Sequence, residues 1–426
     1  MDLRARVARA ALARPAVLLT ASPGATRERL AVEAEIGRRG WSRADAPASA
    51  NLLVFAGTPR RLGGEDWAER VWRAVPGPKA RVTITEAEGA GAALDRGHAL
   101  LLAAAGQSSG GRGGRTGRRP DREVGHGPHD GPGRDDAHGP DGGHGGPPDH
   151  RQGGHRSVGS GDAGPGGHAH AMGGVAGLPL AERGDDRDGL RLDLLHVPLG
   201  PALTEWPAGL VVYLELQGDV VRGAEVDTVP GASPARPAFW NEPWLRALAG
   251  EPVTVGEAAR RTCAAHLDSL GRFLGVAGWR TAAVRARTAR DRALAGAGED
   301  ELRGRVTPLA RRLRGSWTLR WLTAGVGASW EEPGGVDAHR RLILWLDAVE
   351  RGLADLGSRD PLSGLAPVGP RGPVDPRGRA SGTPLDALPG LLRGTEFACA
   401  RLIVASVDPD LDEPPAPDVP GGRAHG

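Results

Sequence analysis

Histidines are the residues of this 426-residue chain whose type and number first suggest chemistry. Eight of the thirteen lie between residues 107 and 175, in a stretch dominated by glycine, proline, aspartate and arginine. Neutral imidazoles bind nickel, zinc and copper, so composition alone permits a metal site there. The spacing is irregular, and so many glycines leave no helix that could present a His-x3-His pair, which makes specific metal binding the less favoured interpretation. The candidate metal ligands are His126, His129, His138 and His144.

The two cysteines offer little further chemistry. Cys263 and Cys399 are far apart in sequence, so neither a disulfide framework nor a thiolate metal cage is expected, and both are interpreted as small buried hydrophobic residues. No GxSxG string lies at a strand-to-helix elbow and the chain has no P-loop, which leaves acyl transfer and nucleotide hydrolysis without support. The turn Ser22-Pro23-Gly24 also lacks a phosphate-binding glycine pattern and is predicted to be a plain strand-to-helix turn.

Charge and hydropathy exclude other classes of function. The 54 basic and 52 acidic residues nearly cancel, and no basic stripe marks a nucleic-acid surface. No apolar run approaches the roughly 18 residues that a membrane-spanning helix needs. We therefore expect a cytoplasmic protein, with a peripheral position at the inner face of the cell membrane as the other location considered. Membrane contact is expected only indirectly, through partners.

The first domain, residues 1–106, is predicted to be a small α/β domain. Short apolar runs at 16–20, 51–56 and 80–85 are typical of strands in a buried parallel sheet. Between them, residues 26–39 and 65–75 have helical patterns. Low apolar content predicts that residues 107–175 form a disordered linker rich in glycine and histidine, and residues 414–426 a disordered tail.

Residues 176–413 are predicted to form an α+β domain. Leu210, Val212, Leu214 and Leu216 alternate along a strand, and residues 217–219 supply the turn of a β-hairpin. A mostly helical body follows, with helical patterns at 240–250, 254–277, 282–294, 301–313, 316–322, 337–356 and 391–405. The predicted fold class is therefore an α/β domain followed by a hairpin and a helical body.

Several of these segments resemble known subunits. The loop Gly200-Pro201 leading into a hairpin with Leu216-Gln217-Gly218-Asp219-Val220-Val221 resembles the start of the large subunit shared by respiratory complex I and [NiFe] hydrogenases. Residues 49–82 are similar to the iron-sulfur small subunit of the same complexes. The closing segment from Ser406 to Glu413 resembles the S-x-DPC-x-x-C end of the hydrogenase branch. Together they indicate a degenerate fusion of the small and large subunits.

The resemblance also implies which ligands are missing. The small subunit holds its cluster with cysteines, and residues 1–262 contain none. The two places of the nickel-iron cysteines are taken by Asp410 and Glu413, whose hard carboxylates cannot reproduce a thiolate site. The family's GP-x-HP histidine is absent, because the loop continues Ala202-Leu203-Thr204. No iron-sulfur or nickel-iron cofactor, and no catalytic or cofactor-binding residue, is expected.

Three hypotheses about function follow. The first is a non-catalytic structural or regulatory subunit, a pseudoenzyme that assembles with other subunits of a complex I-like or hydrogenase-like complex. The second is a quinone-reducing oxidoreductase subunit, NADH-quinone oxidoreductase-like or hydrogenase-like if active, for which Tyr213, His196 and His266 remain available. The third is a nickel-handling accessory protein that acts through the histidine-rich linker. The first is favoured.

Overall fold

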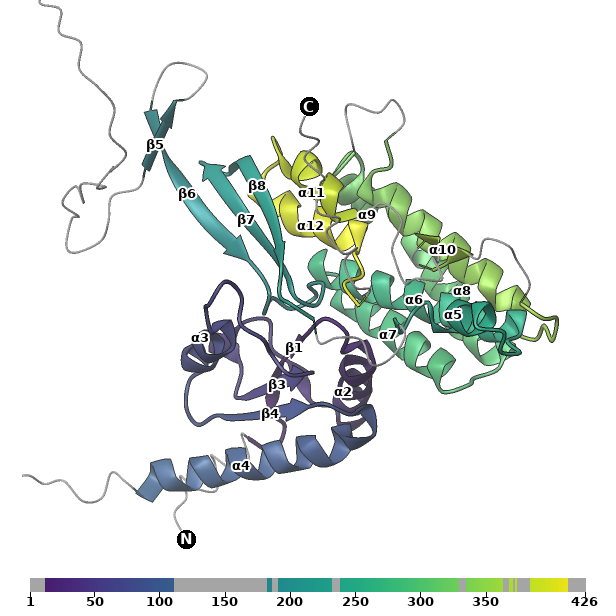
Figure 1. The fold of residues 1–426 in the computed structure, drawn as a ribbon, viewed down its shortest axis with the longest axis horizontal. Helices are drawn as coiled ribbons and strands as arrows, with labels where there is room; N and C mark the ends of the chain where they lie inside the picture. Colours follow the sequence, from purple (N-terminus) through teal and green to yellow (C-terminus); the bar gives the residue numbers. More distant parts are fainter. Residues whose placement is uncertain are drawn as a thin grey trace, which may run out of the picture. The chain divides into compact units, whose positions relative to one another are not determined.

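The computed structural model describes residues 12–110, 182–185, 191–231, 238–328, 335–362, 368–370, 372–373 and 384–412. Within them it has a parallel sheet with helices, an antiparallel sheet and a helical body, as the sequence predicts (Figure 1). Most of the predicted linker and the whole C-terminal tail lie outside these residues. The 3-10 turns are η1 (Pro47–Ser49) and η2 (Ala87–Gly89), and a short ladder joins β9 (Val368–Gly369) to β10 (Gly372–Pro373).

The first sheet is parallel and has the strand order β2-β1-β3-β4. Its strands are β1 (Ala16–Ala21), β2 (Ser42–Arg43), β3 (Leu52–Ala56) and β4 (Ala80–Ile84). The predicted strands correspond to β1, β3 and β4, whereas the two-residue β2 is too short to show an apolar pattern. All five residues of β3 are buried, because helices cover both faces of the sheet.

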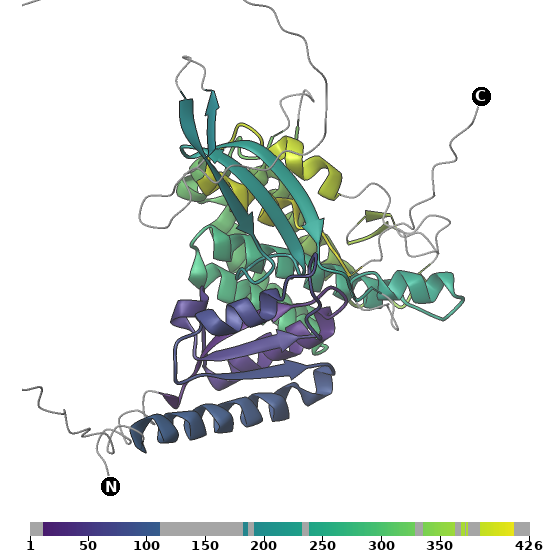
Figure 2. The ribbon, with the colours of Figure 1, turned by 60° about the vertical axis from the view of Figure 1, so that its left-hand side comes forward.

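Alternation along β1 assigns the helices to the two faces of this sheet. Val17 and Leu19 pack with α2 (Thr26–Arg39) and α4 (Ala90–Gly110). Leu18 faces the opposite way and belongs to the cluster that contains Trp67 of α3 (Trp67–Ala74). Figures 1 and 2 both show α4 running beside β4. Helix α4 continues to Gly110, past the boundary expected at residue 106.

The second sheet is antiparallel, with the strand order β5-β6-β7-β8. The strands are β5 (Glu182–Asp185), β6 (Arg191–Leu199), β7 (Leu210–Gln217) and β8 (Val220–Thr228), and β7 and β8 form the predicted hairpin. The alternating apolar residues of β7 face inward and pack against α11 (Pro384–Leu392) and α12 (Phe397–Val407). Figure 2 shows these two helices beside the sheet. The single helix predicted at 391–405 is wrong in extent, because Gly394 adopts a φ of 78° and separates α11 from α12.

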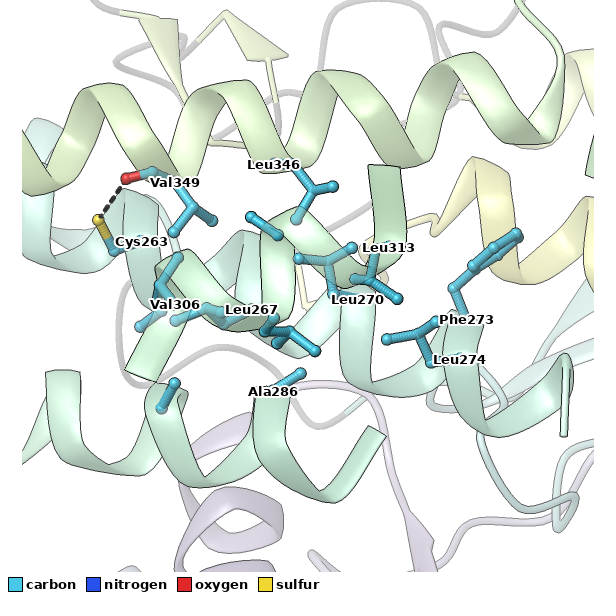
Figure 3. Packing of buried hydrophobic residues seen from close by; sticks show 14 of the residues in the cluster. Cys263, Leu267, Leu270, Phe273, Leu274, Ala286, Val306, Leu313, Leu346 and Val349 are labelled. Carbon is cyan, nitrogen blue, oxygen red and sulfur yellow. Dashed lines mark hydrogen bonds between the residues drawn. The ribbon is translucent and has the colours of Figure 1, made fainter. Parts of the chain in front are cut away.

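The helical body is organised around α6, which contributes more fully buried residues than any other described helix. Leu267, Leu270 and Phe273 lie at the centre of its core, as Figure 3 shows. The helices of the body, α6 included, begin and end within a few residues of the bounds predicted from the apolar patterns. They are α5 (Glu242–Leu248), α6 (Val255–Val276), α7 (Arg280–Leu294), α8 (Glu299–Arg314), α9 (Trp317–Thr323) and α10 (Ala338–Asp355).

Candidate functional site

A group of buried charges joins α2 of the parallel sheet to α6 and α7 of the helical body. Arg29 binds Asp268 through two hydrogen bonds, Nη1 to Oδ1 at 3.1 Å and Nη2 to Oδ2 at 2.8 Å. Arg290 Nη1 donates to Glu33 Oε2 at 2.6 Å and to Asp268 Oδ1 at 2.5 Å. The side chains of Arg290 and Asp268 are 0% and 1% exposed. These four residues form the centre of what we call the junction network.

Helical spacing presents these charges to one another. Arg29 and Glu33 are four residues apart on α2, so they share a face and form their own ion pair at 3.2 Å. Asp268 and Arg272 have the same spacing on α6, at 3.5 Å. Each helix therefore brings an acid and a base to the same contact, and the charges balance where water is excluded.

The junction network extends to the end of the described chain. Arg272 Nη2 lies 2.5 Å from Asp408 Oδ1, and Ser269 Oγ donates to Asp408 Oδ2 at 2.5 Å. Asp408 ends α12 with a left-handed φ of 49°. Four residues later, Asp412 Oδ1 accepts the backbone N–H of Gly24 at 2.8 Å, just before α2 begins. The strand-to-helix turn at residues 22–24 thus binds a carboxylate from the end of the described chain, next to the N-terminus of α2.

The Gly200-Pro201 loop closes another side of the junction network. Glu205, at a φ of 62°, pairs with Arg287 of α7 and lies 3.6 Å from Arg43 Nη2. Arg43 Nη1 in turn is 3.4 Å from Glu33 Oε1. The loop that resembles the family's GP-x-HP segment is therefore tied by its acid to both the parallel sheet and the helical body.

Electrostatics hold the junction network ionised. Burial alone would raise the pKa of Asp268, but the charges of Arg29, Arg272 and Arg290 outweigh burial and hold that pKa well below its ordinary value of 3.8. The pKa of Glu33 is lowered in the same way, chiefly by Arg290. Asp412 differs, because burial raises the pKa of its carboxyl despite the hydrogen bonds from Thr26 and Gly24.

The space left inside the junction is small. A cavity of about 20 Å³ lies among Arg29, Glu33, Arg43, Glu205 and Arg272, with the apolar wall supplied by the Gly200-Pro201 loop and β1. This volume holds roughly one water molecule. The hydroxyl of Thr20, 4% exposed, lines the cavity and donates to no protein atom within the described part of the chain. One bound water would satisfy it, whereas a quinone ring or a metal cluster is far larger.

The cysteines of this chain do not fit the iron-sulfur or nickel-iron cofactors of the enzymes that its sequence resembles. An iron-sulfur or nickel-iron site requires several thiolates, and Cys263 is fully buried on α6 with its thiol 3.4 Å from the carbonyl oxygen of Val349 (Figure 3). Burial raises the pKa of Cys263 to about 12, which keeps it a thiol at neutral pH. Across the described ranges, no three His, Cys, Asp or Glu side chains gather as a metal site would require.

This burial predicts a difference in reactivity between the two cysteines. Cys399 is only partly buried, and burial raises its pKa as well. In the folded protein we expect iodoacetamide to modify Cys399 and to leave Cys263 unmodified, since a pKa of about 12 reduces the thiolate on the order of a thousandfold. Peptide mass mapping after timed labelling measures both sites, and adding urea should release Cys263. Fast native labelling of Cys263 would contradict the buried position.

The structure describes only one of the candidate metal ligands and former ligand positions, Asp410. His126, His129, His138, His144 and Glu413 lie outside the described residues. Asp410 is described, and its Oδ1 accepts the N–H of Asp412 at 3.1 Å.

Two of the proposed quinone-site residues lie on the paired strands β6 and β7, and the third lies on α6. Tyr213 is 42% exposed on β7. Register places His196 of β6 opposite Glu215 and Pro198 opposite Tyr213, so His196 and Tyr213 share the outer face of the sheet, away from its core. His266 is half-buried on α6. These three residues are not assembled into one pocket with the junction network.

Sequence reasoning did not identify the junction network. Its one usable signal was the presence of acids among core positions: Glu33 lies between Val32 and Ile36, and Asp268 between Leu267 and Leu270. A charge on an apolar helix face is buried only when it is paired, so each acid indicated an unseen cationic partner.

The fold and this junction define a protein built from a parallel α/β layer packed by charge pairs on a sheet-and-helix body. No protein-family model matches the sequence, and no curated protein matches it. Among solved structures, a chain of the membrane-bound sulfane sulfur reductase, an archaeal respiratory membrane complex, is similar to it. The similarity is weak: 16% identity and a TM-score of 0.32, over 52% of this chain and 99% of that chain. A similarity at this level identifies neither an activity nor a partner.

Proposed function

We propose that the protein is a non-catalytic structural or regulatory subunit of a complex I-like or [NiFe]-hydrogenase-like assembly. The observation that carries this proposal is the junction between the two parts that resemble the small and large subunits. Salt-bridged side chains fill it, with fully buried Arg290 and Asp268 at the centre and a cavity of only about 20 Å³ beside them.

The chemistry of this junction supports a holding role. Its acids are paired with arginines, and the pKa values of Asp268 and Glu33 are lowered, so neither is available as a proton donor at neutral pH. The fully buried cysteine of the helical body, Cys263, is a thiol with a pKa of about 12. The paired charges of the junction network and the Cys263 thiol are therefore suited neither to proton transfer nor to binding a soft metal. They are suited to holding the two subunit-like parts of the chain together.

The test is an affinity purification of the tagged full-length protein from its native cells, with metal and acid-labile sulfide measured on the same sample. We expect respiratory or hydrogenase-type subunits to co-purify at defined stoichiometry, with no iron-sulfur cluster or nickel assigned to this chain. Recovery of the protein alone would overturn the assembly role. Stoichiometric metal on the isolated chain would instead move the function to the histidine-rich segment.

A further inference from the structure

One end of the helical body carries an unusual sequence. Between residues 302 and 330 the chain has six arginines and three tryptophans and contains no aspartate or glutamate. Acids outside this segment neutralise part of its charge. Arg314 pairs with Asp347 and Glu350 of α10. Arg303 and Arg305 pair with acids in the first turn of α8. Among the described residues, no ion pair forms with Arg311, Arg312 or Arg320.

Two tryptophans project beside these cations. Trp317 and Trp321 lie one turn apart on α9 and are 75% and 71% exposed, the most exposed large apolar side chains of the described chain. Their rings stack with a centroid distance of 6.4 Å and an interplanar angle of 16°. The buried side of α9 is held by Leu319 and Thr323, so the stacked pair is presented outward on an anchored helix.

The cations and the rings share one end of the helical body. Helix α7 begins where α6 ends, and α8 returns alongside α7, so the end of α8 lies next to the start of α7. Arg312 confirms this placement, since its guanidinium sits 5.9 Å from the ring centroid of Trp279. Arg312 and Arg285 also line a hollow of about 300 Å³ next to Trp279. The hollow provides room for a phosphate-sized anion between two arginines.

We propose that Arg311, Arg312, Arg320, Trp317 and Trp321, the arginine–tryptophan surface, bind the headgroup region of an anionic lipid bilayer directly. Arginines attract the negative surface, and indole rings partition to the level of the headgroups. Residues 311–321, which supply all five side chains, contain no aspartate or glutamate, so the segment itself carries only positive charge beside the two exposed rings. The proposal is independent of the assembly role and replaces the expectation that membranes are reached only through partners.

Vesicle co-sedimentation of the purified full-length protein tests this surface. We expect binding to vesicles that mix phosphatidylcholine with phosphatidylglycerol, little binding to phosphatidylcholine alone, and weakening as salt rises. Changing Arg311, Arg312 and Arg320 together to Gln should weaken binding about 100-fold, at about fivefold for each arginine. Trp317→Ser with Trp321→Ser should reduce binding to neutral and anionic vesicles alike.

Matched controls come from exposed residues elsewhere. Leu100→Ser and Arg73→Gln alter side chains that are 55% and 76% exposed on α4 and α3, and both should leave binding unchanged. Inorganic phosphate at matched ionic strength should not displace the protein if the bilayer is the ligand, and displacement would reassign the site to a free anion. If the arginine variant bound anionic vesicles as tightly as the unchanged protein, the proposal would be overturned. It would also be overturned if the unchanged protein bound no vesicles while the arginine variant lost a co-purifying subunit.

Discussion

Asp268→Asn is expected to destabilise the protein by roughly 3–5 kcal/mol, the range found when one partner of a buried ion pair is removed. The substitution keeps the side-chain volume but removes the charge that Arg29, Arg272 and Arg290 share. It also turns amide hydrogens toward guanidinium hydrogens. Each of the three buried cations would then lose one of its counter-charges, leaving Arg29 and Arg290 to share Glu33 and Arg272 with Asp408 alone.

Urea denaturation followed by circular dichroism measures this loss, and Asp300→Asn is its control. Asp300 is exposed in the first turn of α8, so its replacement should change the free energy of unfolding by at most about 0.5 kcal/mol. Equal effects of the two substitutions would show that water reaches the junction network and screens its charges.

The junction network also predicts how stability depends on pH. A carboxylate whose folded-state pKa is lowered contributes stability that is complete above its unfolded pKa and is lost as the pH falls toward the folded pKa. Asp268 and Glu33 both behave in this way, with ordinary values of 3.8 and 4.5. The free energy of unfolding should therefore decrease as the pH falls below about 4. Asp268→Asn should decrease less steeply, and parallel curves would contradict the assignment.

Gly200→Ala should cost about 3 kcal/mol or more, because two penalties coincide at this position. Gly200 has a φ of 97°, which side-chain-bearing residues rarely adopt. An added Cβ would lie 2.6 Å from Trp206 Nε1 and closer still to the carbonyl oxygen of Leu210. Those two atoms form the hydrogen bond, 2.8 Å long, that holds the loop to β7.

Gly218→Ala separates the two penalties. Gly218 has a φ of 62° in the turn between β7 and β8, and an added Cβ there would meet no atom within 4 Å. We expect its replacement to cost only the conformational term, about 1–2 kcal/mol. Thermal and urea unfolding of both variants provide the comparison. If the two variants lost equal stability, the close approach of Trp206 and Leu210 to Gly200 would contribute nothing to the cost of Gly200→Ala.

Local patterns were sufficient to place most elements. The predicted helix at 26–39 matches α2 residue for residue, and the strands at 51–56 and 80–85 match β3 and β4 to within one residue. These segments are short apolar runs or helical patterns, and glycine ends two of them, at Gly40 and Gly57. Strand β5 was missed, because its sequence Glu182-Arg183-Gly184-Asp185 contains no apolar residue. Its pairing with β6 depends on backbone hydrogen bonds that any sequence can form.

The sequence by itself determined the order of elements, the inward face of each and the shortage of thiolate ligands, because these depend on side-chain type and on spacing of two or 3.6 residues. Only the tertiary structure decided that Glu33, Asp268 and Arg290, up to 257 residues apart, would neutralise one another. Charge pairing over such a separation is set by how α2, α6 and α7 pack. An acidic or basic residue type does not by itself specify which opposite charge it will contact. The same packing leaves Trp317 and Trp321 outside the core, whereas Trp240, of the same residue type, is buried.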